Sequence, residues 1–260
     1  MIQLEFGFGA LEEEFWRLLF VMTRIGAALV AAPLFGIPSV PPQLRVIGAG
    51  ALAVLVCAWT EVAVPAALFS LPGLLAVLGE VVVGLALGFV LQLAFAAPVV
   101  AAEVIGGSMG MNMAVAVDPN SGTQSPALGQ YFAVVLTMIF LGLGAHLQWF
   151  ALIVESYRTF PPGETWLGTG RFALIAGFGV QMFATAATIA LPVCLVLLTV
   201  QLVTGVLSRS APALNLFSLG LPAGILGGLA ALLVSAPVLT DLVTRLSREA
   251  IVNASQVIAP

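Results

Sequence analysis

The sequence predicts an all-α membrane protein built from long helical hairpins that glycine and proline kink. Apolar residues make up 61% of the chain and charged residues only 8%, whereas an ordinary soluble domain has about 25% charged residues. The apolar residues gather in long stretches, each near or above the roughly 20 residues that cross a bilayer as a helix. The chain also holds 27 glycines and 16 prolines, the residues that loosen or bend helices.

The apolar stretches define the expected helices of one unit, residues 1–260. A helix satisfies its own backbone hydrogen bonds, and for this reason it is the open form that lipid tolerates. The stretches are Phe15–Ala32, Val46–Leu68, Leu74–Val100, Ala127–Val154, Phe172–Leu207 and Leu214–Leu239.

The stretch Phe172–Leu207 is longer than a bilayer requires. Its 36 residues would extend about 54 Å as a straight helix, against a hydrocarbon core of roughly 30 Å. Pro192 can kink this helix, and Gly177 and Gly179 loosen it further. Pro222 predicts a bend in the last stretch as well. We therefore expect helices that bend or that pack on protein beyond the lipid.

Several glycines recur at helical spacing and predict close helix contacts. Gly84 and Gly88 form a GxxxG pair, and Gly220, Gly224 and Gly228 continue the spacing over two more turns. Such spacing lets a neighbouring backbone approach closely. The alternative is that these pairs arise by chance in a glycine-rich apolar chain.

Charged residues inside apolar stretches are candidate functional groups, because a charge left in lipid costs at least a few kcal/mol. Arg24 lies deep in the first stretch and indicates a buried partner, whereas Arg17 can pair locally with the glutamates just before it. Glu80 and Glu103 are candidate proton-relay groups, with structural pairing or a wet helix end as the favoured interpretation. We take Arg24 and Glu80 as the buried charges.

The side chains offer little chemistry. The sequence has no lysine, which excludes a phosphate-binding GxxxxGK[ST] loop and a Schiff base. His146 has no second ligand at metal-binding spacing, and Cys57 and Cys194 both lie in apolar stretches as expected buried thiols. No basic run offers a nucleic-acid surface. We therefore do not expect an enzyme, and we expect no cofactor, metal or nucleic-acid ligand. We also expect that the N-terminus carries no cleavable signal peptide.

One polar segment, residues 106–126, interrupts the apolar chain and predicts a loop with a gating role. Asp118-Pro119-Asn120-Ser121-Gly122 is a strong turn sequence. Methionines repeat every second residue and can repack around objects of different shape. The gate candidates are Gly106, Gly107, Met109, Gly110, Met111, Met113, Val117, Asp118, Pro119 and Gly122. The alternative is a loop that folds against its own helices, with methionine as a gap filler.

A family resemblance is carried by three segments together. They are GGSMGMNMAVAVDPNSGTQSPALGQYF at 106–132, IFLGLGAHLQWFALIVESYRTFPPG at 139–163, and LSRSAPALNLFSLGLPAGILGG at 207–228. In order and spacing they resemble the FliR family of export-gate proteins from the bacterial flagellar type III secretion apparatus. The resemblance spans essentially the whole chain.

The resemblance implies a part of an export channel in the bacterial inner membrane, within the flagellar basal body. It implies assembly with FliP and FliQ into a helical multi-subunit complex, contact with FlhB and FlhA, and passage of unfolded export substrates. Residues 1–160 are similar to a FliP-type fold and residues 170–240 to a FliQ-type hairpin, followed by a C-terminal tail at 241–260. The loop at 106–122 resembles the family's pore plug, with Met109, Met111, Met113 and Val117 as sealing side chains.

Three alternatives remain at this stage. The first is the homologous component of a virulence injectisome, with the same mechanism and other cargo. The second is a small-solute transporter, which should show inverted repeats and charges at the membrane midplane; we find no convincing repeat. The third is a scaffold without a moving part.

The tail at 241–260 can form an amphipathic helix with Val243, Leu246 and Ala250 on one face, or it can fray.

Overall fold

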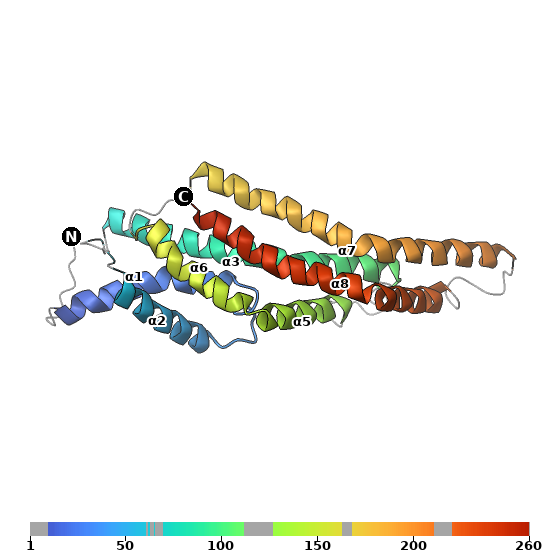
Figure 1. Ribbon diagram of the computed structural model, residues 1–260, viewed down its shortest axis with the longest axis horizontal. Helices are drawn as coiled ribbons and strands as arrows, with labels where there is room; N and C mark the ends of the chain where they lie inside the picture. The colour runs from blue at the N-terminus through green and yellow to red at the C-terminus, as the bar shows by residue number, and fades with distance from the viewer. Residues whose placement is uncertain are drawn as a thin grey trace. The chain divides into compact units, whose positions relative to one another are not determined.

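The protein is described by a computed structural model at residues 10–60, 62, 65, 70–111, 127–162, 168–210 and 220–259. Within these residues the regular structure is helical, which confirms the all-α fold. The helices, drawn in chain order in Figure 1, are α1 (Ala10–Ala31), α2 (Pro42–Trp59), α3 (Leu71–Ser108), α5 (Ala127–Gly142), α6 (Ala145–Thr159), α7 (Thr169–Ser210) and α8 (Leu221–Ile258).

The membrane-crossing candidates are fewer than the predicted stretches. Among the described residues, α2, α3, α7 and α8 are each long and apolar enough to cross a bilayer, and the bent pair of α5 and α6 adds a fifth if it forms one span. The first stretch does form a helix, α1, but α1 is not among these candidates. It carries acidic residues in its first turn and two arginines further along.

The fourth stretch is broken rather than continuous. α5 ends at Gly142 and α6 begins at Ala145, with an angle of 71° between the two helices. Gly144 takes the left-handed conformation, with φ of 67°, which a residue with a side chain rarely adopts. The sequence pattern missed this break because Leu143 keeps the stretch apolar across it.

The long stretch around Pro192 forms one helix, α7, with the proline inside it. By contrast, Pro222 stands in the first turn of α8, where a missing N–H leaves no intrahelical hydrogen bond unmade. The proline inside α8 is Pro237, so the reason given for a bend at Pro222 does not apply. α8 continues through residues 241–258, so this part of the tail is helical, and Val243, Leu246 and Ala250 are buried.

The described chain divides into two compact units. The first comprises residues 1–93, 143–179 and 248–260. In it, α1 packs beside α2, and α2 contacts α6. Arg171, at the start of α7, donates hydrogen bonds to the carbonyl oxygens of Val257 and Ala259 at 3.1 and 2.8 Å. This cation satisfies carbonyls at the end of α8, where a positive charge is favourable.

The second unit comprises residues 94–142 and 180–247. Its core is made of small and branched apolar side chains from α3, α5, α7 and α8, with few aromatic rings. The buried members are Ala101, Ala102, Ile105, Met109, Phe132, Ala186, Ile189, Ala190, Val193, Leu197, Ala231 and Leu239. This core surrounds the point where α3 ends, which is the start of the candidate gate.

Candidate functional site

The segment expected to be a loop begins later than predicted. Gly106 and Gly107 belong to the last turn of α3, which runs to Ser108. Glycine has a low helix propensity in isolation, but here the packed core around Ile105 and Met109 keeps the backbone helical. Gly110 follows with φ of 80°, the left-handed conformation that commonly ends a helix.

The turn after α3 is a Schellman cap. Met111 N–H donates to the carbonyl of Gly106 at 3.0 Å, and Gly110 N–H donates to the carbonyl of Gly107 at 3.0 Å. Met109 N–H donates to the carbonyl of Ile105 at 2.9 Å, as in a regular helical turn. The bonds from Met111 and Gly110 are the pair that defines this cap, and they satisfy carbonyl groups that the end of a helix leaves without partners.

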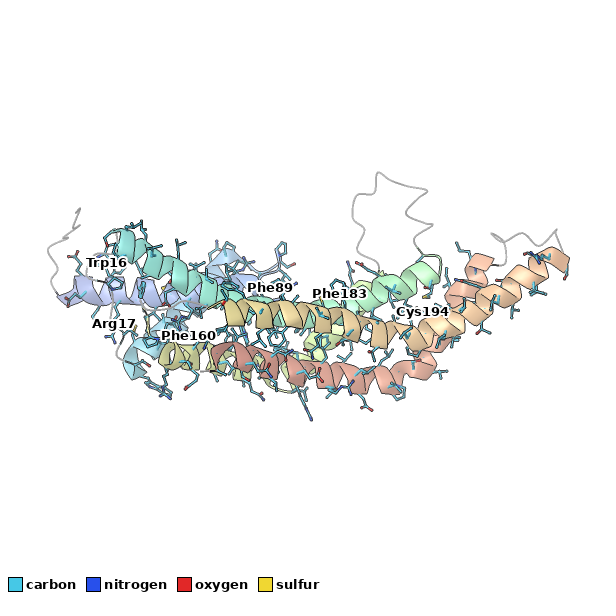
Figure 2. The ribbon with its side chains drawn as sticks, turned by 90° about the horizontal axis from the view of Figure 1, so that it is seen from above. Trp16, Arg17, Phe89, Phe160, Phe183 and Cys194 are labelled. Atoms are coloured by element: carbon cyan, nitrogen blue, oxygen red, sulfur yellow. The ribbon has the colours of Figure 1, made fainter. Side chains whose placement is uncertain are left out.

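A side chain from α7 satisfies the remaining carbonyl. Gln201 Nε2 donates to the carbonyl oxygen of Ser108 at 2.8 Å. About two turns earlier on the same helix, Cys194 Sγ lies 3.7 Å from Ser108 Oγ, and Cys194 is labelled on α7 in Figure 2. The end of α3 is therefore held against α7 by two side-chain contacts.

Met109 is packed against glycines of α8. Its side chain is 3% exposed, and a Cβ added at Gly228 would lie 2.5 Å from its Cγ and 2.7 Å from its Sδ. A Cβ at Gly224 would lie 3.0 Å from the Met109 carbonyl oxygen. The expected close contact at Gly224 and Gly228 is thus present, with a methionine as its partner. Gly220 directly precedes α8.

Met111 also packs against this core as a partly buried side chain. The other gate candidates, Met113, Val117, Asp118, Pro119 and Gly122, lie outside the described residues. The structure thus describes the root of the candidate gate, Gly106–Met111. Hereafter we call Gly106–Met111 the loop root.

The buried charges of the sequence analysis form one bidentate ion pair in the first unit. Arg24 Nε lies 2.8 Å from Glu80 Oε2, Arg24 Nη2 lies 3.0 Å from Glu80 Oε1, and both side chains are fully buried. The remaining N–H groups of Arg24 donate to the carbonyls of Ser156 and Phe160 at 2.7 and 2.9 Å and to Ser156 Oγ at 3.1 Å.

Aromatic side chains of α6 complete this charge cluster. The Arg24 guanidinium lies 4.1 Å from the centre of the Tyr157 ring, a favourable cation–π contact. Tyr157 donates its hydroxyl proton to the carbonyl of Val21 at 2.7 Å. Every donor of Arg24 is used, so the pair acts as a structural junction of α1, α3 and α6. This agrees with structural pairing as the favoured interpretation for Glu80.

Gly84 and Gly88 lie directly beside the ion pair, where α3 meets α1. A Cβ at Gly84 would overlap the carbonyl oxygen of Arg24, and a Cβ at Gly88 would lie 2.5 Å from the carbonyl oxygen of Ala28 and 2.6 Å from Ala31 Cβ. The GxxxG pair therefore marks a real helix contact.

Arg17 has the local partner expected of it. Its side chain lies 3.6 Å from Glu14, and it also donates to the carbonyl of Thr60 at 2.9 Å beyond the end of α2. Figure 2 shows Trp16 and Arg17 together on α1. Glu103 is exposed on α3. Nδ1 of His146 is buried, and no hydrogen-bond partner lies near it in the described structure.

Several residues that position neighbouring helices were not predicted from the sequence. Gln201, Gly227 and Trp149 were not singled out, yet Trp149 donates to the carbonyl of Leu87 at 3.3 Å and a Cβ at Gly227 would lie 3.0 Å from Val200. The only feature of the sequence that could have indicated these residues is a polar side chain or a glycine within an apolar helix. Within the described residues, no group of three His, Cys, Asp or Glu side chains could hold a metal.

The comparisons with known proteins decide the family. The family model described as "Bacterial export proteins, family 1" matches residues 15–250. The chain belongs to the FliR family. The flagellar biosynthetic protein FliR of Escherichia coli (strain K12) is 31% identical over 238 residues, which cover 90% of this chain and 88% of that protein.

Further relatives come from distant bacteria. FliR of Bacillus subtilis (strain 168) is 33% identical over 207 residues, covering 78% of this chain and 80% of that protein. FliR of Aquifex aeolicus (strain VF5) is 29% identical over 229 residues, covering 88% of both chains. Together with the apolar helices, this family makes the chain a membrane-embedded component of the flagellar export apparatus, which works with other export components.

Proposed function

We propose that this FliR-family chain forms, together with FliP and FliQ, the channel that exports unfolded flagellar subunits across the bacterial inner membrane, and that residues 106–122 plug this channel. FlhB and FlhA are the further partners in this proposal. The observation that carries it is a gate candidate rich in methionine and glycine whose root is built into the core of the second unit. A plug needs a fixed end from which its sealing part extends.

The exposed surface of α7 and α8 supports a place inside a larger assembly. In the most apolar segment of each of these two helices, only 22% of the residues are buried within the chain, compared with 56% in the corresponding segment of α3. Apolar helix faces that the chain leaves uncovered require lipid or neighbouring subunits. We propose that this hairpin, within residues 170–240, is the FliQ-like part and that residues 1–160 are the FliP-like part.

The structure changes which residues we assign to sealing. Because Met109 is buried between α3 and α8, its sulfur is not available to line a channel, and we assign it to the loop root. The proposed seal consists of the residues that follow, with Met113 and Val117 as its central side chains. Asp118, Pro119 and Gly122 form the proposed turn.

A deletion of residues 112–122 that spares the loop root tests the plug. We expect cells with this deletion to leak ions through the assembled gate, because the core that holds the helices is unchanged. Membrane conductance and recovery of the complex with FliP and FliQ are measured together. Unchanged conductance with normal recovery of the complex would reject the plug.

Deletion of the whole protein separates the flagellar role from the injectisome alternative. Loss of swimming is expected, whereas loss of effector secretion instead would indicate an injectisome.

A further inference from the structure

Hydrogen bonds cap the end of α3 within the loop root. The last carbonyls of α3, those of Ile105, Gly106, Gly107 and Ser108, receive hydrogen bonds from Met109, Met111, Gly110 and Gln201, respectively. A helix normally leaves its last four carbonyls to solvent or to capping groups. Here three bonds come from the turn itself and one comes from α7.

The side chains of the loop root add apolar contacts with α8. Met109 fills the space above Gly224 and Gly228, and Met111 packs against the same core. Lifting this turn would break net hydrogen bonds of about 0.5–1.5 kcal/mol each and would leave a cavity in the place of a buried methionine. The loop root is therefore costly to move.

We infer that the loop root, Gly106–Met111, is a stationary anchor that α7 and α8 clamp in place while the channel opens, with Gln201, Gly224 and Gly228 as its positioning residues. This inference rests on the proposed plug and adds that Gly106–Met111 keep their contacts with α7 and α8 when the channel opens. Gly224 and Gly228 of α8 then position the loop root, in addition to allowing close helix packing.

A disulfide across the clamp tests the inference in the full complex. Ser108 Oγ and Cys194 Sγ are 3.7 Å apart, so a thiol at residue 108 would lie beside the Cys194 thiol. A small side-chain shift would bring the two sulfurs to the S–S length of about 2.05 Å, and Ser108→Cys should therefore pair with Cys194 upon oxidation. Cys57 is the other free cysteine and is replaced by serine throughout. The matched control carries Ser108→Cys with Cys194→Ser and cannot form the bond.

The variant and the control are assembled with their partners, oxidised with a mild oxidant, and checked for the bond by loss of maleimide labelling and by mass spectrometry of the linked peptides. We expect the bond to form and export of flagellar subunits to stay equal to that of the control. Export that stops on oxidation and returns with reductant would overturn the anchor. Failure of the bond to form in an assembled complex would also overturn it, because the two side chains would then not be held together.

A second pair of variants separates positioning from mere packing. Gly228→Leu should displace Met109 and produce a several-fold ion leak while recovery of the complex is retained, and Met109→Ala in the same chain should remove the crowding and restore the seal. A merely structural contact would lower recovery of the complex instead, with no leak. If the locked chain exports normally but deletion of 112–122 causes no leak, the anchor stands and the proposed plug fails.

Discussion

The two units hold their helices together by different kinds of contact. In the first unit a fully buried Arg24–Glu80 pair and the hydroxyl of Tyr157 bond to backbone groups of other helices. In the second unit the core is apolar, and glycines of α8 receive a methionine side chain. Directional bonds fix one register, whereas thioether and aliphatic contacts can repack. The comparison teaches that, within the described residues, the unit carrying the gate candidate depends mainly on apolar packing, with polar contacts from Gln201 and Cys194 to Ser108.

Removing one partner of the buried ion pair should have the largest effect. Arg24→Met leaves the carboxylate of Glu80 buried without its cation and leaves the carbonyls of Ser156 and Phe160 without a donor. Breaking a buried pair in this way costs about 3–5 kcal/mol. We expect almost no assembled protein in membranes, measured by recovery of the solubilised complex.

The double variant Arg24→Met with Glu80→Met is the control for this experiment. Because it removes both charges, it should recover much of the lost assembly. Equal loss in the single and double variants would show that the charges themselves do not hold the first unit together.

A Cβ placed at glycines of the two units should separate backbone crowding from side-chain crowding. Gly84→Ala drives a methyl group into the carbonyl of Arg24, which cannot move without shifting α1, and should destabilise the protein by about 1–3 kcal/mol. Gly228→Ala meets the Met109 side chain, which can rotate, and should cost about 1 kcal/mol or less. The measurement is thermal unfolding of the purified chain in detergent.

Gly177 provides the matched control for both glycine variants. Nothing lies within 4 Å of a Cβ added there, and alanine in a helix interior is favoured over glycine by roughly 0.5–1 kcal/mol. Gly177→Ala should therefore be neutral or stabilising. A larger loss at Gly228 than at Gly84 would reverse the comparison between the units.

A single hydrogen bond of the first unit should have a moderate effect. Tyr157→Phe keeps the ring over Arg24 but removes the hydroxyl that bonds to Val21, and one such bond contributes about 0.5–1.5 kcal/mol. The unfolding temperature should fall measurably, with normal assembly at growth temperature. A variant as stable as the original chain would mean that the ring, rather than the hydroxyl, fixes the register of α6.

The smallest effect is expected at the surface pair Arg158–Glu155. Their side chains are 64% and 53% exposed and lie 3.3 Å apart, and exposed pairs contribute about 0–1 kcal/mol. Arg158→Ala should leave unfolding and swimming unchanged. A loss comparable to that of Arg24→Met would mean that this exposed face is covered by a partner in the assembled gate.

The sequence predicted the helices well because apolar stretches and helix lengths are local properties. It also predicted that Arg24 needs a buried partner, because an unpaired charge in an apolar stretch is unfavourable. It did not identify Glu80 as that partner, since the pair joins residues 56 positions apart and only the packing of α1 on α3 brings them together.

The misses have a common physical cause. The break at Gly144 and the helical state of Gly106 and Gly107 both concern glycine, whose conformation depends on the surrounding structure more than on its own preference. Gln201 stood out only as a polar residue in an apolar helix, and its partner could not be predicted because it is a backbone carbonyl, which every residue has. The apolar period of Val243, Leu246 and Ala250 did indicate the helical end of α8.

The contact of Arg171 with the end of α8 has a consequence for biosynthesis. The first unit includes residues 248–260 together with residues 1–93, and Arg171 donates to the carbonyls of Val257 and Ala259. Domains generally fold as units while the ribosome works from the N-terminus, but this unit needs residues 248–260, which are made long after residues 1–93. The first unit of a nascent chain can therefore close only after the end of α8 has been translated.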